Sequence, residues 1–164
     1  MDLVARCAVA SLLVSHGVRR DAEFLAVLLG PPRPPRLVRF LGAEVRALNP
    51  DERSTGAILR KALFEDGPAE RSPHPGVYVV SRSLADALAS LPEPIVALEE
   101  GGRDLRAMGL GPDATFVLSD HMDFTEPERA AILARAPTMA AVGPVSLQAD
   151  QVITVVHNEL DRRG

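Results

Sequence analysis

The 164-residue chain has no tryptophan, one cysteine and, among its 18 basic residues, a single lysine, Lys61. Because Cys7 is the only thiol, an internal disulfide and a zinc site built from cysteines are both excluded. Aromatic residues are also few, since Tyr78 and five phenylalanines are the whole set. We expect most of these rings to lie in the core, which leaves few of them for stacking on a ligand.

The motifs of several common sites are missing as well. No GxxxxGK[ST] loop and no GxSxG elbow occurs, so the sequence lacks the motifs on which P-loop phosphoryl transfer and α/β-hydrolase catalysis usually depend. The four histidines are scattered without an HExxH spacing, so we predict no metal site. The segment 109–114 matches GxGxxA, but it leads into a predicted strand instead of opening a helix, and we regard the match as accidental.

Composition points to one soluble globular domain over residues 1–164, because 46% of the residues are hydrophobic and 24% are charged. No apolar run is long enough to cross a membrane. The first residues, with Asp2 and Arg6, do not resemble a signal peptide. We therefore expect a cytoplasmic protein with no membrane partner.

Charge is distributed unevenly along the chain. Residues 1–61 carry ten basic and six acidic residues, whereas residues 62–164 carry eight and sixteen. A cationic half can bind a polyanion even when the whole protein is acidic, because the local field steers association. A chance fluctuation explains the same numbers, and the sequence does not decide between the two.

Predicted strands alternate with predicted helices. Apolar residues predict a helix over 2–16, and the continuous apolar run 23–29 predicts a strand buried on both faces, as in a parallel sheet. Other predicted strands cover 37–41, 76–80, 94–98, 115–118 and 138–142, and other predicted helices run from a Ser54 cap to Leu63, over 83–91, over 125–135 and to the C-terminus, with a helical turn at 104–108. This order predicts an α/β fold with a mostly parallel sheet flanked by helices.

Three of these strands run into turn-forming or polar sequence. The strand 94–98 leads into Glu99–Gly102, the strand 115–118 into Ser119–His121, and the strand 138–142 into Gly143-Pro144. Open parallel sheets bind ligands outside the carboxyl ends of their strands. We therefore expect these loops to share one edge and to hold a small molecule.

The last of these loops precedes a helix with a stripe of apolar residues. Gly143 lets backbone approach a ligand closely, and Pro144 fixes one dihedral angle. The stripe, at Val152, Val155, Val156 and Leu160, predicts that this helix packs on the core and fixes the loop. An ordinary amphipathic C-terminal helix fits the same pattern.

Several strings together resemble the archaeal tRNA pseudouridine-54 N1-methyltransferase family of the SPOUT superfamily. The resemblance covers nearly the whole chain in order, and it rests on DLVARC (2–7), LVSHGVRRD (13–21), LLGPP (28–32), LNPDER (48–53), PGVY (75–78), FVLSDH (116–121), GPVSLQAD (143–150) and VVHNELD (155–161).

The resemblance implies a fold whose C-terminal part forms a trefoil knot that binds S-adenosyl-L-methionine. It also implies a homodimer with RNA, in particular tRNA, as substrate. Carried over by position, the cofactor contacts are Ala97, Leu98, Ser119, Asp120, Gly143, Pro144, Val145, Ser146, Leu147 and Val152.

The chain departs from the family pattern at three places. Family members usually begin with an additional strand and a short loop before the helix that starts here at Asp2, so either the gene start is misplaced or the fold lacks that strand. Ser119 stands where the family often has glycine, and QADQV (148–152) stands where the family often has HADHC. Substrate and cofactor contacts are expected to differ there.

Methylation of N1 of pseudouridine requires loss of the N1 proton, and a carboxylate beside an arginine suits this chemistry. Asp51 and Arg53 are the first candidates for contact with the base, and Arg6, Arg19 and Arg20 are candidates for phosphate or the dimer interface. Helix capping by the same NPDER turn, with an internal ion pair, is the structural alternative. A flipped base would also need a ring to stack on, for which Tyr78 and Phe124 are candidates.

Two other functions remain open on the sequence. A SPOUT methyltransferase that acts on another RNA fits the altered Gln148 and Gln151. A non-catalytic RNA-binding homologue fits the expected lack of the first strand.

Overall fold

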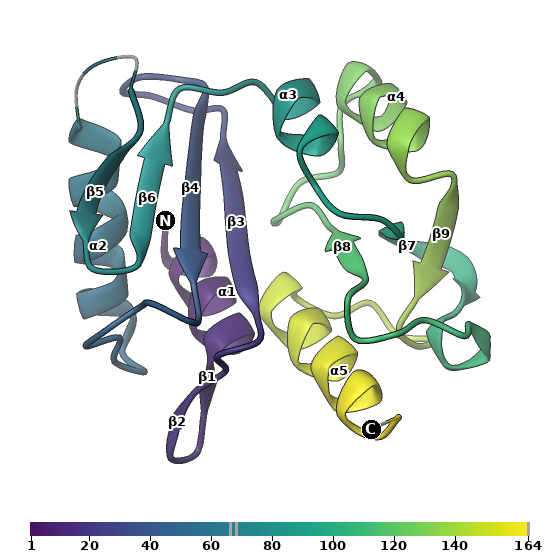
Figure 1. Ribbon diagram of the computed structural model, residues 1–164. Helices are drawn as coiled ribbons and strands as arrows, with labels where there is room; N and C mark the ends of the chain where they lie inside the picture. The colour runs from purple at the N-terminus through teal and green to yellow at the C-terminus, as the bar shows by residue number, and fades with distance from the viewer. Residues whose placement is uncertain (66, 68, 164) are drawn as a thin grey trace. The chain divides into compact units, whose positions relative to one another are not determined.

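A computed structural model describes residues 1–65, 67 and 69–163. The chain divides into two compact units, Met1–Ser83 and Leu84–Gly164. Each unit has its own main sheet with helices packed on it (Figure 1). Strands and helices occur in both units, so the predicted α/β class is confirmed.

The first unit contains a four-stranded sheet with the order β3-β4-β6-β5, in which all neighbouring strands are antiparallel. Its strands are β3 (Glu23–Leu28), β4 (Arg36–Leu41), β5 (Arg71–His74) and β6 (Val77–Val80). The prediction that 23–29 is a parallel strand buried on both faces is wrong, since β3 is a half-buried edge strand. The connection 29–35 is shorter than the roughly dozen residues of a parallel crossover, so the chain returns antiparallel as β4.

Two helices, α1 (Asp2–Leu12) and α2 (Glu52–Phe64), pack on one face of this sheet (Figure 1). The predicted helix over 2–16 is too long, because β1 (Leu13–Val14) and β2 (Gly17–Val18) form a small hairpin directly after Leu12. The shared core is made of small and aliphatic side chains around one ring, namely Ala5, Ala8, Leu12, Val38, Phe40, Leu59, Ala62, Val77 and Val79.

The second unit contains a three-stranded parallel sheet with the order β8-β7-β9. Its strands are β7 (Ile95–Asp104), β8 (Thr115–Val117) and β9 (Thr138–Ala141). The predicted strands over 94–98, 115–118 and 138–142 are therefore confirmed, and they are parallel as expected. Beyond Leu98, β7 bulges and then pairs again with β9 through Arg103 and Asp104, and the short helix η1 (Leu105–Ala107) follows.

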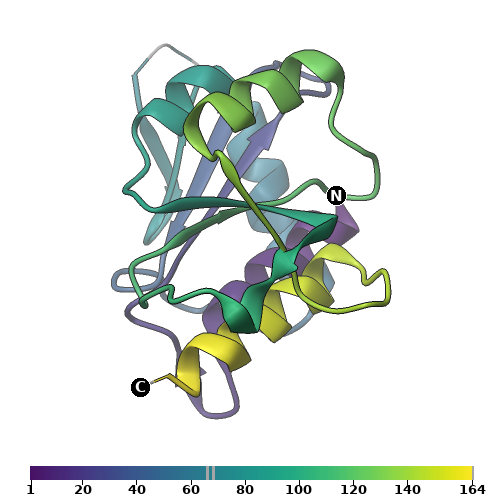
Figure 2. The same ribbon diagram turned by 90° about the vertical axis from the view of Figure 1, so that its right-hand side faces the viewer.

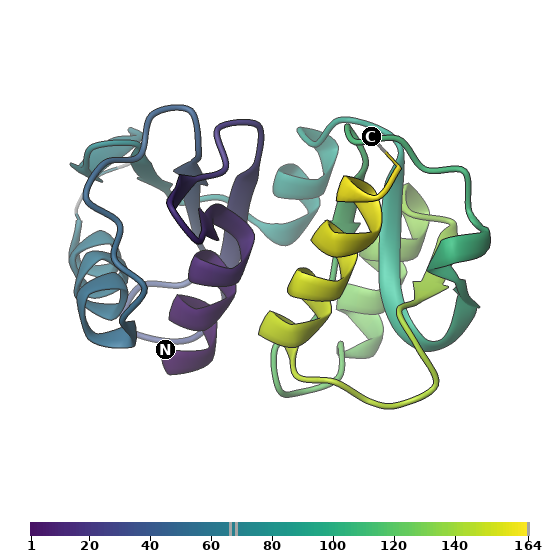
Figure 3. The same cartoon turned by 90° about the horizontal axis from the view of Figure 1, so that it is seen from below.

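Helices cover both faces of the parallel sheet (Figure 2). The helices α3 (Leu84–Ala89) and α4 (Glu126–Arg135) pack on one face with Ile95 and Ala97. The C-terminal helix α5 (Ala149–Asp161) packs on the other face with Val96 and Leu98 (Figure 3). The alternation of side chains along β7 thus supplies both cores.

The described residues form two antiparallel sheets, both in the first unit, and one parallel sheet in the second, so the predicted mostly parallel sheet describes the second unit alone. Within residues 1–65, 67 and 69–163, every helix is too short or too polar to span a bilayer.

Candidate functional site

The carboxyl ends of β7, β8 and β9 meet at one edge of the second unit's sheet. Ala97 pairs with Val117 of β8 and with Met139 of β9, so all three strands run in the same direction in close register. The loops after β8 and β9 begin at Leu118 and Val142, whereas β7 continues past Leu98 as a bulge and pairs again with β9 at Arg103. The strand pairing therefore brings the loops after β8 and β9 and the bulge of β7 to one edge, but the prediction that Glu99–Gly102 is a loop after the strand is wrong, because this segment is part of β7.

Two polar contacts fix the chain at this edge. The Ser146 hydroxyl donates a hydrogen bond to Oε1 of Glu100, which ties the loop after β9 to the bulge of β7. Nη1 of Arg129 on α4 lies 2.7 Å from Oε1 of Glu99. Because Glu99 is only 18% exposed, this ion pair is partly shielded from water.

The third loop is folded by its own carboxylate. Oδ1 of Asp120 accepts hydrogen bonds from the amides of His121, at 2.6 Å, and Met122, at 3.1 Å. Oδ2 of Asp120 lies 3.1 Å from Nδ1 of His121. The predicted site residues Ser119 and Asp120 therefore form a compact turn at the end of β8.

The Gly143–Leu147 loop leaves space at the same edge. A side chain built on Gly143 would meet no atom within 4 Å. Val145 is 68% exposed and Leu147 is 38% exposed, so the loop also presents apolar side chains to its surroundings. Backbone groups, carboxylates and apolar side chains together suit a ligand that has a flat apolar part and several hydroxyl or amino groups.

The loop continues directly into α5, which is anchored on the sheet. Gln151 Oε1 accepts a hydrogen bond from the Gln148 amide at 3.1 Å, and these two residues form a capping box. Val152 and Leu160 pack partly buried beside Val156 on the core shared with β7. Three of the four residues of the predicted stripe thus pack on this core, Val155 lies outside it, and the stripe missed Ile153, which is buried. The packed helix fixes where the loop ends (Figure 3).

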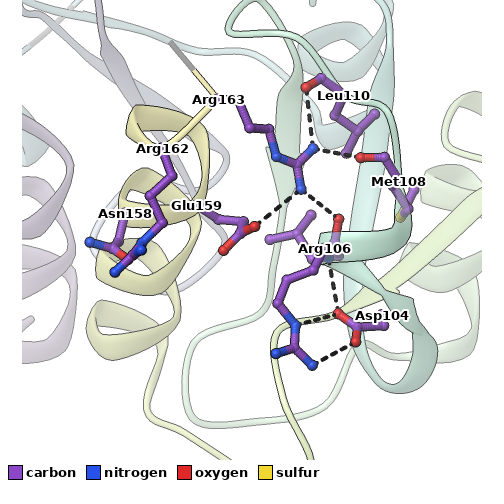
Figure 4. A network of polar contacts seen from close by, with 9 residues as sticks. Asp104, Arg106, Met108, Leu110, Asn158, Glu159, Arg162 and Arg163 are labelled. Carbon is purple, nitrogen blue, oxygen red and sulfur yellow. Dashed lines mark hydrogen bonds and ion pairs between the residues drawn. The ribbon is translucent and has the colours of Figure 1, made fainter.

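The other end of α5 is tied to the segment after β7 by Arg163 (Figure 4). Its guanidinium donates to the carbonyl oxygens of Leu105 at 2.9 Å, Met108 at 2.5 Å and Leu110 at 3.3 Å. It also lies 3.5 Å from Oε1 of Glu159. No pattern in the sequence indicates this contact, because its acceptors are backbone carbonyls more than fifty residues away.

Asp51, in the first unit, is the N-cap of α2, so the predicted cap at Ser54 is wrong. Oδ1 of Asp51 accepts from the Ser54 amide at 2.8 Å, and the Ser54 hydroxyl donates to Oδ2 at 2.7 Å. These bonds, led by the one from the hydroxyl, hold the pKa of the Asp51 carboxyl below its ordinary value. The capping interpretation of the NPDER turn is thus realised, and the contact of Asp51 with a substrate stays a prediction.

Arg6 reaches the same turn from α1. Its Nη1 lies 3.4 Å from Oε1 of Glu52, between the candidates Asp51 and Arg53. This pair is well exposed, and we expect it to contribute little to stability. The structure therefore brings the three predicted residues Arg6, Asp51 and Arg53 to one place on the first unit.

In the described part of the chain, no group of three or more histidine, cysteine or acidic side chains is arranged to hold a metal ion.

Comparison with known proteins gives the chemistry of this arrangement. The family described as "Putative SAM-dependent RNA methyltransferase" matches residues 1–164. The chain is 44% identical to a protein of Methanocella arvoryzae named tRNA (pseudouridine(54)-N(1))-methyltransferase, over 99% of this chain and 85% of that protein. It is 43% identical to the protein of the same name from Methanopyrus kandleri, over 98% of this chain and 78% of that one.

A solved structure is similar in fold. The crystal structure of Archaeoglobus fulgidus Nep1 bound to S-adenosylhomocysteine matches with a TM-score of 0.62. The two sequences are 16% identical, and the match covers 98% of this chain and 69% of that one. Because this family matches residues 1–164 of the chain, the chain belongs to the family of SAM-dependent RNA methyltransferases.

Proposed function

We propose that this protein transfers a methyl group from S-adenosyl-L-methionine to N1 of pseudouridine in tRNA. The observation that carries the proposal is the shared carboxyl edge of β7, β8 and β9, where the open Gly143–Leu147 loop is tied to Glu100 by Ser146. The names of the relatives supply the substrate, and the ligand of the Nep1 crystal structure supports the cofactor.

The residues at this edge fit the proposed cofactor. Its adenine needs backbone hydrogen bonds and apolar cover, which the 143–147 loop and the end of β7 offer, and its ribose and amino groups need acceptors such as Glu100 and Asp120. When bound, the cofactor supplies an electrophilic methyl group. The proposed contacts are Ala97, Leu98, Ser119, Asp120, Gly143, Pro144, Val145, Ser146, Leu147 and Val152.

Asp51, Arg53 and Arg6 are the proposed contacts to the substrate. When the bond from N1 to the methyl carbon forms, the methyl–sulfur bond of the cofactor would break to leave S-adenosylhomocysteine, and the N1–H proton would pass to water. A carboxyl with a lowered pKa is a weak proton acceptor, so the role that fits Asp51 is to accept the N–H hydrogen bond and orient the ring. The two arginines would hold phosphate or negative charge that develops on the base.

The proposal extends to the assembly. We propose that both units act together as one SPOUT-type domain, that the C-terminal part forms the trefoil knot, and that two copies associate in the cytoplasm. The exposed apolar side chains Met122, Val145 and Leu147 at the carboxyl edge support an association that covers them.

Calorimetry with S-adenosylmethionine tests the cofactor site. Gly143→Val should abolish binding while the protein stays folded, because a Cβ atom at this position meets no atom of the chain within 4 Å. Gly111→Val is the matched control, since that position is equally open and lies in another loop of the same unit. Near-normal affinity of Gly143→Val would show that the loop is misassigned.

Nucleoside mass spectrometry of tRNA from a deletion strain tests the substrate. Loss of N1-methylpseudouridine is expected. Unchanged modification together with cofactor binding would favour a methyltransferase for another RNA, and a folded protein that binds RNA but no cofactor would favour the non-catalytic homologue.

A further inference from the structure

A solvent-open hollow lies on the first unit between the loop after β4 and the turn that joins β5 to β6. Its volume is about 500 Å³, and it is lined by Arg20, Ala43, Glu44, Arg46, Pro75 and Gly76. This volume is within the range of small-molecule sites and is sufficient for one nucleotide. None of these residues belongs to the contacts proposed above for the cofactor or the base.

The wall of the hollow is fixed by bonds from three separate segments. Nη1 of Arg20 donates to the carbonyls of Gly42 at 2.8 Å and Val45 at 3.1 Å. Nε2 of His74 lies 2.7 Å from the Arg46 carbonyl oxygen. The Tyr78 hydroxyl donates to Oε2 of Glu44 at 2.5 Å. A loop held in this way is preorganised, which lowers the entropy cost of binding.

The backbone of this wall is both tightly packed and strained. Gly76 has a φ of +74°, and a Cβ atom there would lie 2.2 Å from the Val45 amide nitrogen. Ala47, the residue after Arg46, has a φ of 51°, which non-glycine residues rarely adopt. Such strain persists where surrounding structure enforces it, and it gathers at ligand sites.

The side chains of the hollow offer two kinds of contact. Arg46 is exposed, and its guanidinium has no hydrogen-bond or ion-pair partner among residues 1–65, 67 and 69–163. An arginine fork can pair with phosphate or stack on an unpaired base. Glu44 uses one carboxylate oxygen for Tyr78, so the other can accept from an amino group of a base.

The geometry points to a binding site for one nucleotide of the RNA substrate, with its phosphate on Arg46 and its base beside Glu44. This inference rests on the proposed function, because an RNA methyltransferase that flips a base out of a folded arm must also hold the neighbouring chain. The excess of basic residues over positions 1–61 gives the same unit the field to attract that chain.

Fluorescence anisotropy with labelled tRNA transcript tests the site. Arg46→Ala is expected to weaken RNA binding by about tenfold and to reduce the slope of log K against log salt by about one, as for the loss of one phosphate contact. Arg60→Ala is the matched control, because Arg60 is also exposed but lies on α2 outside the hollow, and less than a twofold change is expected there.

A second pair of variants tests the same hollow independently, in case Arg46→Ala lowers the stability of the protein. Ala43→Glu adds a carboxylate to the rim of the hollow and should weaken RNA binding by charge repulsion, whereas Ala57→Glu on exposed α2 should not. All variants should bind S-adenosylmethionine as the unaltered protein does. Equal RNA affinity of each variant and its control would overturn the hollow as a nucleotide site. Failure of the unaltered protein to bind tRNA would instead contradict the proposed function.

Discussion

The two units present ligand-binding groups in different ways. The first is an antiparallel sheet with helices on one face, and its candidate contacts Arg6, Arg53 and Arg46 lie on α1, on α2 and on the loop after β4. The second is a parallel sheet with helices on both faces, and its candidate site is an edge where β8 and β9 end beside the bulge of β7. Antiparallel strands end alternately at opposite edges, so two neighbours cannot both end at the same one.

This difference suits a two-substrate enzyme. A small cofactor needs enclosing backbone loops, which parallel strand ends supply. An RNA needs cations on a rigid surface, and under the proposals above Arg6, Arg46 and Arg53 of the first unit would supply them. Single substitutions can weaken the packing, the ion pairs or the hydrogen bonds of one unit at a time, and the largest loss of stability is expected in the parallel sheet.

Gly102→Ala should damage the parallel sheet most. A Cβ atom at this position would lie 2.6 Å from the carbonyl carbon of Ala140 in β9, where backbone cannot give way easily. We expect a loss of about 3 kcal/mol in the free energy of unfolding, as for a severe core overpacking. Urea denaturation measures it, and Gly109→Ala, which is open within 4 Å, is the control. Equal stability of the two variants would show that β7 and β9 are not packed this closely.

Arg163→Ala should loosen the end of α5. Three backbone carbonyls lose a charged donor, and we expect a loss of about 2 kcal/mol. Arg162→Ala is the control, because the Arg162 side chain donates to Asn158 Oδ1 of α5 at 2.9 Å and to no other element in the part of the chain that the structure describes, so it should change stability little. If α5 also fixes the position of the 143–147 loop, Arg163→Ala should raise KM for S-adenosylmethionine, measured well below the melting temperature of the variant. Matching stabilities for these two variants would contradict the clamp.

Asp51→Asn should have a smaller effect on stability, because asparagine is also a good N-cap. Since the folded-state pKa of Asp51 is lowered, its carboxylate stabilises the fold above the ordinary aspartate pKa, and this contribution is lost as pH falls through the folded-state pKa. Thermal unfolding of both proteins should therefore converge in acid. Turnover should fall at neutral pH while cofactor affinity stays unchanged, and full activity of Asp51→Asn would remove Asp51 from the substrate site.

The smallest effect on stability is expected from loss of the hydrogen bond between Tyr78 and Glu44. Its hydrogen bond to Glu44 raises the pKa of the phenol, so this bond stabilises the first unit below the ordinary tyrosine pKa and is lost as pH rises through the folded-state value. The chain has one tyrosine and no tryptophan, so tyrosinate absorbance reports this group alone. Glu44→Gln removes the charge but keeps an acceptor, and it should lower the midpoint. An unchanged midpoint would mean that Glu44 does not hold the hydroxyl.

Much of the second unit could be predicted from the sequence. The apolar runs 94–98 and 115–118 predicted two parallel strands, although only the first half of the central β7 is buried and β8 is a half-buried edge strand. The same reasoning is wrong for 23–29, because an edge strand beside a short connection has a similar apolar composition. Composition reports burial, whereas strand direction depends on the length of the connection and on what covers the sheet.

The parts of the candidate sites that depend on backbone conformation could be predicted from the sequence. The parts that depend on side-chain contacts were harder to predict. Gly143 and Pro144 restrict the backbone directly, so their loop was identifiable from local sequence. Asp51 and Ser54 both fit a helix cap, and only the geometry assigns the cap to Asp51. Contacts such as those of Arg163 and Arg20 end on backbone carbonyls, which carry no residue identity, so no sequence pattern could indicate them.

The capping box at the start of α5 bears on how the enzyme would respond to acidity. Gln148 and Gln151 close the helix with amide groups, at positions where the related family often carries histidines. Amides do not titrate, whereas histidines at the same positions would change charge near neutral pH. The entry to α5 should therefore keep its shape across the physiological pH range, and any pH dependence of cofactor binding would arise from other groups.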